Sequence, residues 1–271
     1  MNLVFAGAIV VLVAVAAVVL LALVRRRAGG PVLREPGRGT PTSALAGTAF
    51  AVLLALITLA AFQTYNGAQD GAEDEAVAVV ELFRTAGLFP TAQHDELRGD
   101  FVCYARAVIS DEWPAMEHGD TSPLVDHWVF AYRRLFNRLD LSSARERLGL
   151  EDMLASARDR TAGRRDRLRQ ATPSVPTPLW LVLVLGGLVS IALQLAFADP
   201  RERLAVQAAM LAGVATLVTA GLLLVSFLDH PYRDGPGKIE PTAMQESLSM
   251  MTEQEPHLSL PCGSEGQPTP Q

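Results

Sequence analysis

This chain of 271 residues has few of the features that mark metal sites and nucleic-acid-binding proteins. Its two cysteines, Cys103 and Cys262, are too few for a zinc site of the C-x-x-C type. They pair if their side of the membrane is oxidising, and two separate free thiols are the other reading. The formal net charge of −6 and the mixing of basic with acidic residues do not predict a nucleic-acid partner.

Charge is absent from four long hydrophobic runs, which cover residues 3–24, 44–62, 179–198 and 204–228. An α-helix rises about 1.5 Å per residue, so about 20 apolar residues cross a hydrocarbon core of about 30 Å. In lipid the backbone must satisfy its own hydrogen bonds, which favours helices. The runs therefore predict an all-α integral membrane protein with four transmembrane helices.

The first run differs from a cleaved signal peptide. Only Met1 and Asn2 precede it, whereas Arg25, Arg26 and Arg27 follow it. A signal peptide places its positive charge before a shorter apolar stretch. We expect an uncleaved anchor whose N-terminus lies outside the cell.

The hydrophobic runs also lack the residues that do chemistry. No Asp, Glu, Lys, Arg or His lies deep within them, which disfavours a proton-coupled transporter. No nucleophile, base or metal-ligand set stands out there. We expect no enzyme activity, no catalytic residues, no cofactor and no metal site.

The four spans divide the chain into a membrane pair (1–62), a helical extramembrane domain (63–178), a second membrane pair (179–228) and a polar tail (229–271). Apolar residues at helical spacing predict central helices over 73–88, 93–116 and 123–139. A fourth central helix should begin after Ser142 or Ser143 and run to about residue 170. The tail is rich in Pro, Gly, Ser, Gln and Glu, which predicts disorder from about Glu253.

The arginines near the spans bear on orientation. The link between the first two spans carries Arg25, Arg26, Arg27, Arg34 and Arg38, and the link between the last two carries Arg201 and Arg203. Short cytoplasmic loops are enriched in such charges, so this count favours an extracytoplasmic central domain. The arginines ahead of the third span, together with Arg233 and Lys238 after the fourth, favour the opposite orientation: Arg158, Arg160, Arg164, Arg165, Arg167 and Arg169.

A motif follows the fourth span, where the chain should leave the membrane. Its marked residues are Asp229, Pro231, Tyr232, Gly235 and Pro241. Proline cannot continue a helix, and tyrosine suits the membrane interface. We interpret the motif as a structural exit from the membrane, with a binding or gating element as the alternative.

This motif resembles a known family. Leu228-Asp-His-Pro-Tyr232 followed by Ile239-Glu-Pro241 is similar to the L-D-x-P-F … V-x-P element of the bestrophin-like domain family of bacterial membrane proteins. The resemblance includes Glu112-Trp-Pro114, Arg164-Arg-Asp-Arg167 and Pro178-Leu-Trp180, and covers roughly residues 44–245. Tyr232 replaces the usual Phe, and Arg233-Asp-Gly235 is longer than the usual turn.

The resemblance implies a function. Bestrophins are pentameric anion channels whose second span lines the pore and whose central helices lie in the cytosol. By analogy the pore-lining candidates here are Thr48, Phe50, Thr58 and Phe62. The expected partners are the lipid bilayer, further copies of the chain and small anions. The alternative is a non-conducting envelope protein whose central domain binds a partner or senses stress.

Overall fold

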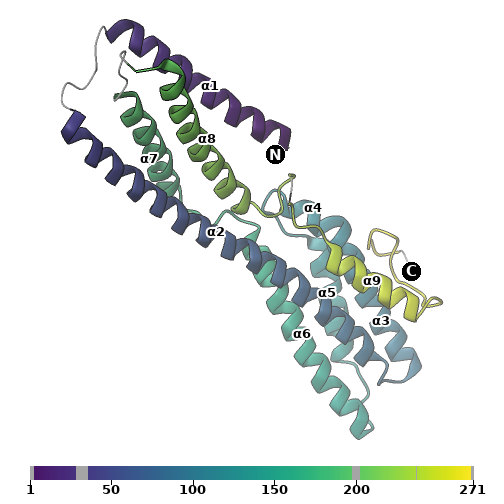
Figure 1. The fold of residues 1–271 in the computed structure, drawn as a ribbon. Helices are drawn as coiled ribbons and strands as arrows, with labels where there is room; N and C mark the ends of the chain where they lie inside the picture. The colour runs from purple at the N-terminus through teal and green to yellow at the C-terminus, as the bar shows by residue number, and fades with distance from the viewer. Residues whose placement is uncertain (1–2, 29–35, 197–201, 236, 270–271) are drawn as a thin grey trace. The chain divides into compact units, whose positions relative to one another are not determined.

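The computed structural model describes residues 3–28, 36–196, 202–235 and 237–269 (Figure 1). Throughout these ranges the regular structure is helical, and the only β-type pairing is an isolated bridge between Cys262 and Pro268. The predicted all-α fold is confirmed. The helices, in chain order, are α1 (Leu3–Ala28), α2 (Pro36–Ala86), α3 (Thr91–Ala107), the π-helical turn η1 (Val108–Glu112), α4 (Trp113–Met116), α5 (Pro123–Phe136), α6 (Ala144–Gln170), α7 (Thr177–Ala196), α8 (Leu204–Leu228) and α9 (Thr242–Gln254).

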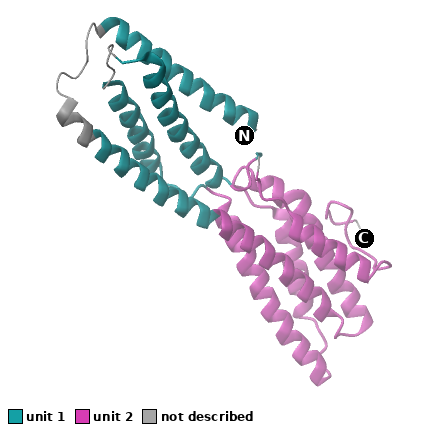
Figure 2. Ribbon diagram, viewed as in Figure 1, with its two compact units in different colours: residues 1–64, 173–230, 234–236 teal, residues 65–172, 231–233, 237–271 magenta. Residues whose placement is uncertain are grey.

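The chain folds into two compact units, which Figure 2 colours separately. Unit 1 holds residues 1–64, 173–230 and 234–236. Unit 2 holds residues 65–172, 231–233 and 237–271. Each unit therefore combines segments that are distant in the sequence.

Unit 1 contains the membrane-spanning part of the chain. The helices long and apolar enough to cross a membrane are Leu3–Arg27, Ser43–Ala86, Thr177–Ala196 and Leu204–Leu228, which confirms the four predicted spans. Large apolar side chains cover much of their exposed surface, including Val4, Leu45 and Leu217. Such a surface suits contact with lipid rather than water.

Two apolar seams hold unit 1 together. Ala17 and Leu21 of α1 pack on Leu211 and Ala215 of α8. Phe50 and Ile57 of α2 pack with residues of α7 and α8, namely Leu183, Val218 and Val225. At one end of α8, the Arg25 guanidinium donates a hydrogen bond to Gln207 Oε1 at 2.8 Å. Both seams thus converge on α8.

Helix α2 differs from the expectation, because it does not end near residue 62. It runs unbroken from Pro36 to Ala86, so the span and the first central helix are one element of 51 residues. The sequence from 63 to 72 contains no proline, and its two glycines, Gly67 and Gly71, weaken a helix without ending it. The chain therefore reaches unit 2 inside a helix.

Unit 2 is built around one aromatic-rich core. Its buried members include Phe83, Phe101, Tyr104, Trp128 and Tyr132, from α2, α3 and α5. The first turn of α6 follows ordinary capping rules. The hydroxyl of Ser143 accepts from the N–H of Glu146, whose side chain accepts from the N–H of Ser143, so Ser143 is the cap of α6.

The tail is more ordered than its composition predicts. Residues 242–254 form α9, and the C-terminal segment, residues 255–269, has a defined path against α3 and α5. The expectation of disorder from about Glu253 is therefore corrected. A polar composition usually predicts disorder, but here a disulfide and hydrogen bonds to backbone carbonyls hold the segment in place.

Candidate functional site

The four pore-lining candidates on α2 do not share one face. Thr48 is exposed and Phe62 is 47% exposed, and both point away from the other helices of unit 1. Thr58 is half-buried, and its hydroxyl donates to the Leu54 carbonyl at 2.7 Å. Phe50 is 9% exposed. A pore formed between subunits needs side chains on an outer face, so Thr48 and Phe62 remain as candidates.

The position of Phe50 depends on a glycine of α7. A Cβ atom on Gly186 would lie 2.6 Å from Phe50 Cδ2, whereas one on the adjacent Gly187 would lie 2.6 Å from Val218 Cγ1. The ring therefore fills the space that the missing side chain of Gly186 leaves. Phe50 is a packing residue of the subunit interior, and the analogy with a pore position does not extend to it.

Asp229, in the exit motif, holds the entrance to α7. Its Oδ1 accepts hydrogen bonds from the N–H groups of Ser174 at 2.7 Å and Val175 at 2.8 Å, and from the Ser174 hydroxyl at 3.0 Å. These donors lie just before α7 begins, where N–H groups lack helical partners. Asp229 thus ties the end of α8 to the start of α7 within unit 1.

The remaining motif residues have separate structural roles. The Tyr232 hydroxyl donates to the Ala68 carbonyl at 3.1 Å, and its ring meets the Trp113 ring edge-on at 5.7 Å. The Pro231 carbonyl accepts from the Ile239 N–H at 2.9 Å. Gly235 lies in the turn between them, and Pro241 precedes α9. This bonding supports the structural interpretation of the motif.

A buried ion cluster in unit 2 is the most elaborate polar feature of the described chain. Arg167, Glu75 and Glu112 each have fully buried side chains. The Arg167 guanidinium donates to Glu75 at 2.6 and 3.1 Å and to Glu112 at 2.6 Å. Arg164 donates to Glu112 at 2.5 Å and to Asp126 at 2.6 Å. Two motifs of the family resemblance, at 112–114 and 164–167, thus bind each other, a contact that the sequence alone did not predict.

Local backbone features place these charges. Gly71 of α2 and Gly163 of α6 let the two helices touch, because a Cβ on Gly163 would lie 2.6 Å from the Glu75 nitrogen and 2.9 Å from the Gly71 oxygen. Glu112 closes the π-helical turn η1, just before Pro114. Proline has no N–H for the regular i→i−4 bond, which favours a widened turn there.

The cluster is electrostatically coupled. Burial alone would raise the pKa of Glu112, but Arg167 and Arg164 outweigh it and hold that pKa below its ordinary value. Burial and the neighbouring Glu75 raise the pKa of Tyr104 well above its usual range, so its hydroxyl stays protonated and donates to Glu75. Glu112 is therefore charged and Tyr104 neutral at neutral pH, which suits a structural role for their contacts.

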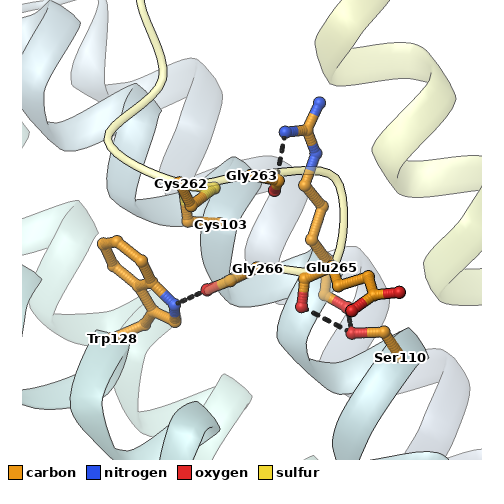
Figure 3. Close-up of a disulfide and its surroundings, with 8 residues drawn as sticks. Cys103, Ser110, Trp128, Cys262, Gly263, Glu265 and Gly266 are labelled. Atoms are coloured by element: carbon orange, nitrogen blue, oxygen red, sulfur yellow. Dashed lines mark hydrogen bonds between the residues drawn. A yellow bond between two sulfur atoms is a disulfide. The ribbon is translucent and has the colours of Figure 1, made fainter. Parts of the chain in front are cut away.

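A disulfide joins Cys103 of α3 to Cys262 of the C-terminal segment (Figure 3). Three hydrogen bonds to backbone carbonyls hold the segment beside it: Arg106 to Gly263 at 3.0 Å, Ser110 to Glu265 at 2.6 Å and Trp128 to Gly266 at 2.8 Å. Gly266 has φ +78°, and a Cβ there would lie 2.6 Å from the Ala107 nitrogen. Of the two readings of the cysteines, the structure shows the bonded pair.

The described residues contain no group of three or more His, Cys, Asp or Glu arranged to hold a metal ion. The ionisable side chains of the buried cluster are fully engaged with one another. The geometry thus presents an apolar four-helix membrane unit and a pinned, crosslinked helical unit.

Comparison with known proteins gives this architecture a family. Among curated proteins, none matches the chain. A bacterial bestrophin homolog from Klebsiella pneumoniae is 16% identical with a TM-score of 0.68, over 94% of this chain and 100% of that chain. A variant of that homolog is 15% identical with a TM-score of 0.70, over 91% and 98%. A further structure, described as a membrane protein, is 14% identical with a TM-score of 0.71, over 90% and 99%.

At these identities the structures show a shared fold only. The sequence itself matches the bestrophin-like domain over residues 10–244, which is most of the chain. The resemblance that the exit motif indicated is confirmed. The chain belongs to the bestrophin-like domain family.

Proposed function

We propose that copies of this chain assemble around the exposed face of α2 and conduct small anions. The observation that supports this is an uncharged outer stripe on α2. It carries small and polar side chains at three- and four-residue spacing, with Phe62 at one end: Ala44, Thr48, Ala51 and Ala55. Small residues allow membrane helices to approach closely, and apolar rings can gate a pore by excluding water.

Anion flux tests this proposal. Purified protein in chloride-loaded liposomes should release chloride faster than empty liposomes do. Phe62→Ala should raise the flux, because it widens the proposed constriction. Leu217→Ala is the matched control, since Leu217 is an apolar, 73% exposed side chain of α8. Flux no greater than in empty liposomes, at full reconstitution, would refute conduction.

We further propose that unit 2 lies outside the cytoplasm. A disulfide persists where the environment is oxidising, and bacterial cytoplasm keeps most thiols reduced. The arginines of the two short links favour the same orientation, whereas the resemblance to bestrophins favours a cytosolic unit 2. The bonded pair Cys103 and Cys262 is the observation that supports the external orientation most directly.

Single new cysteines test this orientation in intact cells. Ser142 is exposed in unit 2, and Glu202 is exposed just before α8 in unit 1. One membrane span separates them from each other in the proposed topology, so a membrane-impermeant maleimide should label Ser142→Cys and spare Glu202→Cys. The bonded native cysteines do not react. Labelling of Glu202→Cys alone would show the opposite orientation, with unit 2 in the cytoplasm.

The external disulfide also favours a second candidate function. In it, unit 2 is a binding module of the cell envelope and the membrane helices only anchor it. Under this alternative the protein releases no chloride from liposomes, yet unit 2 remains accessible from outside. The flux and labelling experiments together separate the two functions.

A further inference from the structure

A groove runs between α5 and α6 in unit 2. It consists of two adjoining cavities of about 560 and 550 Å³, which share the lining residues Arg133, Thr161 and Arg165. The shared residues make the cavities one continuous feature. Nothing in the family resemblance or the proposed pore assigns a role to it.

The lining of the groove has one sign of charge. Its described lining residues include no Asp or Glu. The arginines that line it are Arg133, Arg158, Arg160, Arg164, Arg165 and Arg169. Arg164 is neutralised by the buried cluster, and Arg169 lies 3.8 Å from Asp166. The other arginines of the groove form no ion pair within the described part of the chain.

Arg160 is the unusual member, because it is buried without a carboxylate partner. The residue is 2% exposed. Its Nη1 lies 3.4 Å from the Tyr104 hydroxyl, its Nη2 donates to the Thr161 hydroxyl at 3.0 Å, and its Nε has no partner among the described residues. The nearby Tyr132 hydroxyl is also buried and unpartnered within the described chain.

These contacts do not neutralise the buried charge of Arg160. Hydroxyl groups and the faces of the Tyr104 and Tyr132 rings, at 5.3 and 5.8 Å, stabilise a guanidinium but do not neutralise it. A buried charge without a counter-charge and an unsatisfied buried donor both destabilise the folded state. Glu75 is reached only through the Tyr104 hydroxyl and is already bound by Arg167. An anion from outside the chain would supply the missing negative charge and an acceptor for the unsatisfied donor.

We propose that the groove between α5 and α6 binds a phosphate-bearing anion, with Arg160 at its floor and Arg133 and Arg165 at its rim. Guanidinium groups pair with two phosphate oxygens at once, and the groove is lined by several of them. The groove is larger than one phosphate group, so it has room for a phosphate ester. This site is independent of the proposed pore. Its ligand is either a soluble phosphate compound or a phospholipid headgroup, which share this chemistry.

Ligand-induced stabilisation of the full chain tests the proposal. In phosphatidylcholine nanodiscs, inorganic pyrophosphate should raise the unfolding temperature with a saturable dependence on concentration. Arg160→Gln and Arg165→Gln should each raise the half-saturating concentration about tenfold or more, since each removes a charge-assisted hydrogen bond to the anion. Arg165 is exposed, so its replacement leaves folding intact.

Arg147→Gln is the matched control, because Arg147 is exposed on the same helix outside the groove. It should bind pyrophosphate as the unaltered chain does. An equal loss of affinity in this control would show unspecific attraction and overturn the proposal. Non-saturable stabilisation of the unaltered chain would overturn it too.

A second arm separates the two sources of phosphate. Nanodiscs that contain phosphatidylglycerol, without pyrophosphate, should stabilise the unaltered chain over Arg165→Gln if a headgroup occupies the groove. Stabilisation by pyrophosphate alone would assign a soluble ligand. Should Arg165→Gln change the oligomeric mass and leave pyrophosphate affinity unchanged, carboxylates of a second copy would be the occupant, and the proposal would fail.

Discussion

Glu75 on α2 and Arg167 on α6 are joined by two hydrogen bonds, of 2.6 and 3.1 Å, with both side chains fully buried. The two residues are 92 positions apart in the sequence. Arg167 also binds Glu112 and lies 5.0 Å from the centre of the Trp113 ring. One guanidinium thus fixes α2, α6 and the turn η1 relative to one another inside unit 2.

Removal of the Arg167 charge should destabilise unit 2 strongly. Arg167→Met leaves Glu75 and Glu112 buried without their shared counter-ion, and loss of one partner of a buried pair costs about 3–5 kcal/mol. Tryptophan fluorescence during chemical unfolding measures the change, because Trp113 and Trp128 lie in unit 2. Arg147→Met, at an exposed position of α6, should change stability little. Equal effects of the two substitutions would contradict a pinning role.

Gly163 should not tolerate a methyl group. A Cβ there would meet backbone atoms of Gly71 and Glu75, which cannot rotate away as a side chain can. We expect Gly163→Ala to cost about 1–3 kcal/mol or more and to separate α2 from α6. Gly213→Ala is the control, since a Cβ on Gly213 meets nothing within 4 Å and alanine favours a helix. Thermal unfolding of both variants should show opposite signs.

The sequence predicts the four spans because uninterrupted hydrophobicity over about 20 residues is rare outside membrane helices. It does not predict that Phe50 faces inward, because α2 is apolar on all sides near that residue and only its neighbours on α7 select a face. The sequence also does not predict the pairing of Glu75 with Arg167, since that pairing depends on how closely α2 and α6 approach. The glycines at 71 and 163 were the available signal for that approach.

The C-terminal segment shows a different limit of sequence reasoning. Its composition is typical of a disordered tail, yet Cys262 anchors it and Gly266 fits tightly against Ala107. Low hydrophobicity predicts disorder only when apolar burial is the sole source of order. A crosslink supplies order by another route.

Reduction of the disulfide should therefore loosen the tail and lower stability. Cys103 and Cys262 are separated by 159 residues, and a crosslink over so long a loop stabilises by about 2–5 kcal/mol through the unfolded state. We expect a mild reductant to lower the unfolding temperature and to increase proteolysis within residues 255–269. The double variant Cys103→Ser/Cys262→Ser should match the reduced protein and should not respond to reductant. A response in the double variant would point to an effect unrelated to this bond.

Asp100 should make stability depend on pH. It is 6% exposed on α3, and burial, together with Glu96 and against the opposing effect of Arg134, raises the pKa of Asp100 from 3.8 to about 7. Because the folded-state pKa exceeds the unfolded one, this group favours the folded state fully below about pH 4 and loses that contribution as pH rises towards 7. At one pKa unit per about 1.4 kcal/mol, the loss reaches at most about 4 kcal/mol.

Asp100→Asn keeps the shape of the side chain and cannot ionise. Its stability relative to the unaltered chain should therefore be about 2–3 kcal/mol more favourable near pH 8 than near pH 5, by linkage. Urea unfolding at both pH values measures this difference. Asp152→Asn, at an exposed position of α6, should give the same small change at each pH. If Asp100→Asn also shifted stability equally at both, Asp100 would be ionised in the folded protein throughout this range, and burial would not control its charge.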